Sequence, residues 1–290
     1  MSFIIEKERS FYITSQLANY TLLGDGSKLG RDGTLVSSDG STVFINLDES
    51  ITIPTGAIET NFRVEQAAVW YTAPNISQAL ENNTFSYIYN EVAQPVIVIP
   101  DGLYSVESLN DVLSREFINR GQLENLVVLS SDESTQKVVI TVAKYTQVDL
   151  SLYNSIRGVI GWNSQIWPLL MPVVETNKSG ENVAAFNNIQ AFTIRSDLTP
   201  DGIPINNSKS NLMALVTIPP NGANNQIVYS PNHPTIIESQ SYRGKTINNF
   251  YVQICDQNGK VVPQSEPFVV LIVMHYKVLF SNQEVGIIDF

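Results

Sequence analysis

The amino-acid sequence predicts a mainly β protein, a β-sandwich whose series of strands is interrupted by an inserted α+β subdomain. Apolar and polar residues alternate in four stretches, which is typical of strands with one buried face; these are residues 42–47, 62–71, 85–89 and 250–254. Turn-forming pairs such as Asp101-Gly102 separate them, and Asn258-Gly259 predicts a tight hairpin. Only one long segment has helical periodicity, which argues against an all-helical fold.

Further runs are apolar on both faces, and their short length and β-branched residues favour fully buried strands over helices. They are residues 96–99, 138–142, 212–218 and 268–274. One segment predicts a helix instead, because Ser105 is a good N-cap and Gly121 can end the helix. Apolar residues recur between them at helical spacing, namely Val106, Leu109, Leu113 and Phe117. A second, shorter helical turn is expected within residues 152–160.

These patterns divide the chain into three parts. Residues 1–41, with three Asp-Gly pairs, are expected to form an N-terminal arm or edge segment. Residues 42–99 together with 186–290 hold the strands of the sandwich. Residues 100–185 hold the helix and form the inserted domain.

The composition excludes several classes of protein. The 290 residues suffice to bury a large core, and only 16% are charged, so a disordered chain is not expected. A net charge of −11 argues against a protein that coats nucleic acid. Cys255 is the only cysteine, which rules out a disulfide within the chain and fits folding inside a cell. We recognise neither a signal peptide nor an apolar run long enough to span a membrane.

The sequence holds no recognisable catalytic or metal-binding constellation. His233 and His275 are the only histidines, and the chain has no Gly-x-Ser-x-Gly nucleophile motif. One cysteine and two distant histidines do not fit a zinc site. Gly244-Lys245-Thr246 lacks the earlier glycine of a phosphate loop. We therefore expect no enzyme, no catalytic residue, no metal and no cofactor, and a sandwich hydrolase that uses the histidines is the weakest hypothesis.

Trp162 and Trp167 lie five residues apart among Asn, Gln and Pro. Burial within the inserted domain is favoured, because tryptophan is usually mostly buried. The other interpretation is a surface contact with carbohydrate or protein. It belongs to an alternative function for the chain, a β-sandwich module that binds a receptor or a glycan.

A series of segments follows in a characteristic order. They are Val96–Ile99 with Pro100-Asp101-Gly102, Tyr104–Leu113, Val138–Val142, Ile156–Trp162, Phe186–Ile189, Thr193–Leu198, Val228–Pro231, Gly244–Phe250, Ile254–Gly259 and Pro267–Leu271. In order and spacing, over about residues 40–280, this series resembles the penton, or minor capsid, proteins of virophages and Maverick/Polinton elements. The segment before residue 40 matches least.

The resemblance implies a single jelly-roll β-sandwich with an insertion domain, and no catalytic residues. It implies homopentamers at the vertices of an icosahedral capsid, surrounded by a double jelly-roll major capsid protein. The implied location is the virion, after folding in the host cytoplasm or virus factory, and the insertion is expected to contact any host-surface receptor. Eight jelly-roll strands are expected near residues 43–53, 62–73, 85–99, 189–196, 212–218, 226–237, 247–256 and 267–278, with the insertion between the third and the fourth.

Overall fold

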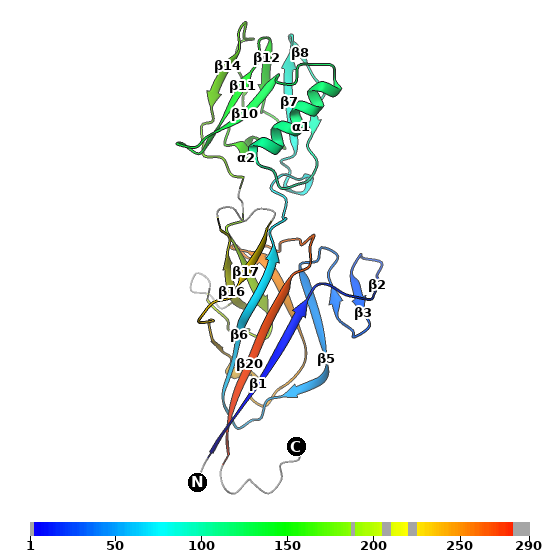
Figure 1. Ribbon diagram of the computed structural model, residues 1–290, viewed down its shortest axis with the longest axis vertical. Helices are drawn as coiled ribbons and strands as arrows, with labels where there is room; N and C mark the ends of the chain where they lie inside the picture. The colour runs from blue at the N-terminus through cyan, green and yellow to red at the C-terminus, as the bar shows by residue number, and fades with distance from the viewer. Residues whose placement is uncertain (1–2, 187–188, 205–209, 220–224, 281–290) are drawn as a thin grey trace. The chain divides into compact units, whose positions relative to one another are not determined.

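The computed structural model describes residues 3–186, 189–204, 210–219 and 225–280. The chain forms two compact units. The first is Met1–Thr72 together with Ile189–Phe290, and the second is Ala73–Asn188. In Figure 1 the first unit contains both the blue and the red ends of the chain, and the second contains the green middle. An insertion therefore interrupts the first unit.

The described part of the first unit is a sandwich of two antiparallel sheets. One has the order β1-β20-β6-β17, with β18 also paired to β6, and the other has the order β16-β15-β19-β5-β4-β3-β2. The strands of the first sheet are β1 (Phe3–Thr14), β20 (Val269–Phe280), β6 (Ala57–Trp70), β17 (Gln226–Tyr229) and β18 (Ile237–Glu238). Those of the second are β2 (Tyr20–Leu22), β3 (Lys28–Gly30), β4 (Leu35–Val36), β5 (Thr42–Thr52), β15 (Ala191–Ser196), β16 (Leu212–Thr217) and β19 (Thr246–Asp256), and a short 3-10 helix, η2 (Gln240–Tyr242), precedes β19.

The strand order is that of a jelly roll. β17 and β18 pair with successive parts of β6 and act as one interrupted strand. Eight strands then follow in the chain as β1, β5, β6, β15, β16, β17–β18, β19 and β20, without the short β2–β4. The two sheets contain them in the orders first-eighth-third-sixth and fifth-fourth-seventh-second. Eight antiparallel strands in two sheets that exchange strands in this way define the jelly roll that was expected.

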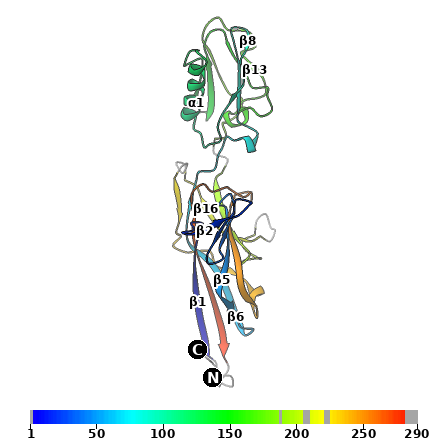
Figure 2. The same cartoon turned by 90° about the vertical axis from the view of Figure 1, so that its right-hand side faces the viewer.

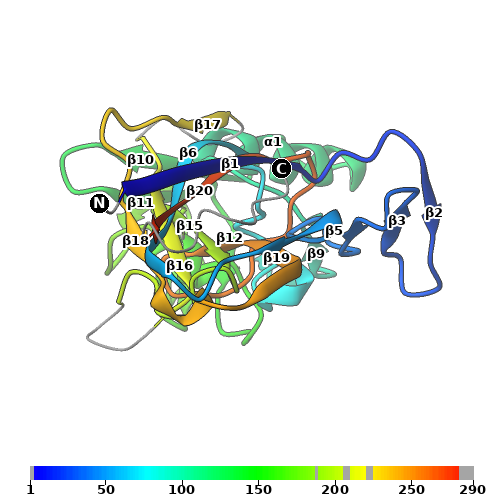
Figure 3. The same ribbon diagram turned by 90° about the horizontal axis from the view of Figure 1, so that it is seen from below.

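The core of the sandwich lies between the two sheets. Figure 3 shows β1, β20 and β6 in one layer and β5 and β19 in the other. The ring of Phe11 on β1 meets the ring of Phe250 on β19 edge to face, with centroids 5.2 Å apart. Tyr71, just after β6, meets Phe192 on β15 in the same way at 5.7 Å. Such aromatic pairs join the inner faces of the two sheets.

The N-terminal arm or edge segment expected for residues 1–41 has to be corrected. Within residues 1–41, β1 pairs with β20 over twelve residues, from Phe3 opposite Phe280 to Thr14 opposite Val269. This segment is the first strand of the jelly roll. No local pattern reveals it, because its partner residues lie at least 255 positions away in the chain (Thr14 opposite Val269). The rest of the segment forms β2–β4, which extend the second sheet beyond β5 (Figure 3).

Within its described residues, the second unit contains two small antiparallel sheets and one long helix. The sheets have the orders β10-β11-β14 and β13-β12-β7-β8, with β9 also paired to β7. The strands are β7 (Thr84–Tyr89), β8 (Val92–Ala93), β9 (Ile97–Val98), β10 (Val127–Asp132), β11 (Lys137–Val142), β12 (Thr146–Asp149), β13 (Ile166–Trp167) and β14 (Thr176–Ser179). The helices are η1 (Gln78–Leu80), α1 (Val106–Asn119) and α2 (Arg157–Ile160).

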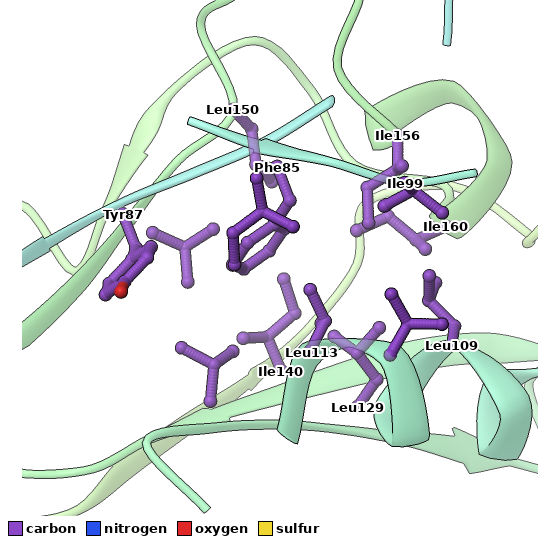
Figure 4. Close-up of a cluster of buried hydrophobic side chains, with 14 of the residues drawn as sticks. Phe85, Tyr87, Ile99, Leu109, Leu113, Leu129, Ile140, Leu150, Ile156 and Ile160 are labelled. Atoms are coloured by element: carbon purple, nitrogen blue, oxygen red, sulfur yellow. The ribbon is translucent and has the colours of Figure 1, made fainter. Parts of the chain in front are cut away.

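The helix predicted between Ser105 and Gly121 is confirmed as α1. The Ser105 side chain accepts a hydrogen bond from the Ser108 backbone, and Gly121 adopts a φ of 70° just after the helix. Figure 2 shows α1 along one side of the second unit, beside its strands. In Figure 4, Leu109 and Leu113 of α1 point toward the buried side chains of the other elements, including Phe85 on β7. The second expected helical turn is α2.

The expected boundaries of the inserted domain also have to be corrected. We expected residues 85–99 to form the third strand of the sandwich, but they form β7, β8 and β9 of the second unit. The third strand of the jelly roll is β6, and the chain crosses into the second unit at Ala73. The insertion still falls between the third and fourth strands, as expected. Asn75 holds its two ends together, since its Nδ2 donates to the carbonyls of Tyr104 (2.7 Å) and Phe186 (2.9 Å).

Two local predictions had different outcomes. The Asn258-Gly259 hairpin is confirmed, because the Gly259 amide donates to the Asp256 carbonyl at 3.0 Å and Gly259 has a φ of 82°. The prediction of a fully buried strand at residues 96–99 is wrong. Ile97 and Ile99 are buried, but Val98 between them is 66% exposed, so the segment has one buried face.

Candidate functional site

Trp162 is a core residue of the second unit. Its side chain is 3% exposed, and its indole Nε1 donates to the Val138 carbonyl at 3.1 Å. A Cβ on Gly180 would lie 2.9 Å from the indole ring, so the glycine allows the ring to lie this close to the backbone. The burial favoured by the sequence is therefore found for Trp162, and this ring offers no surface for a ligand.

Trp167 is partly exposed and lies on β13, opposite Val148 of β12. Its ring centroid is 5.5 Å from that of Trp162. The two tryptophans thus pack as a pair with one buried and one accessible member. A surface contact through Trp167 stays a hypothesis.

Glu181 is the centre of a polar cluster beside this pair. Its carboxylate accepts hydrogen bonds from Lys178 Nζ (2.6 Å), Gln165 Nε2 (2.9 Å) and the Asn163 amide (3.1 Å). Partial burial opposes ionisation of the group, but these donors outweigh it and lower the pKa of Glu181 to about 2. The Lys178 ammonium also lies 5.3 Å from the Trp162 ring centroid. The cluster fixes the segment around residue 181 against the turn that carries Trp162.

An apolar loop, Pro168–Val174, follows Trp167 directly. Leu169 is 85% exposed and Leu170 81%, the highest values among the large apolar side chains of the described residues. Val173 and Val174 are 72% and 66% exposed. This loop was not predicted, although the sequence carries a signal for it: the nine residues Ile166–Val174 include no charged side chain.

The two histidines lie in different settings. His275 on β20 has its Nε2 3.6 Å from Glu6, and Lys277 on the same strand contacts Glu6 and Glu59 at 3.6 and 3.0 Å. These side chains belong to the outer face of the β1-β20-β6 sheet. His233 is exposed between β17 and β18. Across the described ranges, no group of three metal-binding side chains gathers in one place. The expectation that the chain is not an enzyme stays a prediction.

The first unit carries an open groove beside an exposed apolar extension. The groove, of about 540 Å³, lies between the end of β1, the segment after it and β5. Apolar side chains stand exposed on and beside the short strands β2 and β3; they are Tyr20 (50%), Leu22 (65%), Leu23 (36%) and Leu29 (37%). We call residues 20–36, which form β2–β4, the flap. These apolar side chains of the flap are exposed in a single copy of the chain.

The strand order defines the class of this protein as a jelly roll with a domain inserted between the third and fourth strands. Neither a protein-family model nor a curated protein matches the sequence. The chain is similar to the crystal structure of the SeMet-labelled mavirus penton protein, with 11% sequence identity and a TM-score of 0.47. The match covers 93% of this chain and 99% of that chain. No residue role is carried over from it.

Proposed function

We propose that this chain is a minor capsid protein of the penton type, which forms pentamers at the five-fold vertices of an icosahedral shell. The jelly-roll strand order, with its insertion between the third and fourth strands, is the observation that carries the proposal. Jelly rolls recur in viral capsid proteins. The order of sequence segments that resembles penton proteins adds independent support.

A closed ring of five identical subunits needs two different surfaces on each subunit. The flap supplies one of them in this proposal, because its apolar side chains are exposed at the outer end of a sheet. Exposed apolar patches of this kind mark contacts with other proteins. The strands β16 and β17, which lie at the other edges of the two sheets, are available for the second surface.

The second unit is proposed to have the separate task of contacting the host. It has its own core of buried side chains and its own sheets, so it can vary without disturbing the jelly roll. A double jelly-roll major capsid protein would surround the pentamer in the shell. The virion is the corresponding location.

The mass of the purified protein tests the vertex proposal. We expect light scattering to give about five times the 32.2 kDa of one chain, or co-assembly with a double jelly-roll major capsid protein into shells with five-fold vertices. Leu22→Asp should abolish the ring, because it places a charge in the proposed contact. Val98→Asp, at an equally exposed site of the second unit, is the matched control. A monomer that also ignores the capsid protein would contradict the proposal.

A receptor- or glycan-binding module is the second candidate function, and partial exposure of Trp167 is the observation that favours it. Trp167→Ala should then remove binding to a glycan array while leaving the fold intact. Oligomeric protein that gives no signal on the array would count against this function.

A further inference from the structure

The apolar loop of the second unit lies outside the surfaces that the proposed pentamer uses. Within Ile166–Val174 there is no charged side chain, and Leu169 and Leu170 are almost fully exposed. Contiguous exposed apolar side chains mark a contact with another protein or with a membrane. We propose that this loop inserts into the surface of an electrically neutral lipid bilayer.

Part of the backbone of the loop is hydrogen-bonded to other segments of the second unit. Gln147 Nε2 donates to the Pro168 carbonyl at 2.7 Å and lies 3.4 Å from the Leu169 carbonyl. The Tyr145 amide donates to the Pro172 carbonyl at 2.7 Å. The two prolines have no N–H group to satisfy. These bonds hold the loop to the second unit while its apolar side chains stay exposed.

The residues at the base of the loop are those that favour a membrane–water interface. Trp167 precedes the loop, and Tyr145 touches it through the bond to Pro172. The Lys144 ammonium lies 5.8 Å from the centroid of the Tyr145 ring. Aromatic rings and lysines are enriched at headgroup level, where an apolar body meets water.

The net charge of the protein indicates which lipid headgroups the loop can approach. The chain has a net charge of −11, so an anionic bilayer would repel it. Insertion driven by apolar contact does not need opposite charges and should be insensitive to salt. Neutral phosphatidylcholine is therefore the expected surface. No helix within the described ranges has both the length and the apolar character needed to cross a membrane.

Flotation with phosphatidylcholine vesicles tests the inference. We expect the wild-type protein to float with the vesicles, and each of Leu169→Asp and Leu170→Asp to lower the bound fraction about tenfold or more. Val174→Asp should weaken binding, whereas Val98→Asp, at the same 66% exposure on β9, should not. Leu170→Met should bind like the wild type, since it replaces one apolar side chain by another. Vesicles with added phosphatidylserine should bind less protein.

A probe on the loop separates insertion from mere adhesion. Cys255 is 1% exposed, so Leu170→Cys provides one accessible thiol for an environment-sensitive dye. The dye should brighten and shift to the blue with vesicles, and the same dye on Val98→Cys should not respond. No response at residue 170 would overturn the inference. The inference would also be overturned if the wild type bound no lipid and Leu170→Asp lost self-association. The loop would then contact a second copy of the chain. The mass of the pentamer is measured separately, so either proposal can fail alone.

Discussion

Asn110 on α1 makes both of its amide hydrogen bonds to the backbone of Leu129 on β10: its Nδ2 donates to the carbonyl at 2.5 Å, and its Oδ1 accepts from the amide at 2.8 Å. This pair attaches the helix to the adjoining sheet. Asn110→Ala should lower the free energy of unfolding by about 2 kcal/mol, because it leaves two backbone groups unpaired. Hydrogen exchange of the β10 amides should accelerate. Asp111→Ala, at the exposed neighbouring position, should leave this exchange unchanged.

Trp162 stabilises the second unit through packing and one hydrogen bond. Trp162→Phe should cost about 1–2 kcal/mol, because the Val138 carbonyl keeps the bond from the Gly180 amide when the indole donor is lost. Trp162→Ala should cost about 3–5 kcal/mol through the cavity that it creates. Denaturant unfolding measures both. Equal and small effects of Trp162→Ala and Trp167→Ala would show that Trp162 is not a core residue.

Glu181 makes the stability of the second unit depend on pH. Its pKa of about 2 lies below the ordinary value of 4.5, so its stabilising effect is complete above pH 4.5 and is lost as the pH falls toward 2. Glu181→Gln should cost about 1–3 kcal/mol at pH 7, a range reduced for the partial exposure of the side chain. The difference between wild type and variant should shrink between pH 4.5 and 2. A difference that is constant with pH would contradict the role of the ionised carboxylate; exposed Glu175→Gln is the control.

The sequence predicted those features that depend on neighbouring residues. The helix was predictable because Ser105, Gly121 and the apolar spacing between them lie within 17 residues. β1 was not, because its role depends on pairing with β20 at the other end of the chain. The candidate site divides in the same way. The two tryptophans are visible in the sequence, but only the fold shows that one is buried and that an exposed apolar loop follows the other.

Adjacent residues of β1 test whether this segment is a strand of the sandwich or an arm. Phe11 is 7% exposed and meets Phe250 across the core, whereas Tyr12 is 72% exposed. Phe11→Ala should therefore lower the free energy of unfolding of the jelly roll by about 3–5 kcal/mol, since it leaves a cavity between the two sheets. Tyr12→Ala should change it by no more than about 0.5 kcal/mol, as is usual for a surface side chain. Denaturant unfolding of the two variants, each compared with the wild type, gives the answer. In a detached arm the two alanines would have the same small effect, because neither aromatic ring would then contribute to a core.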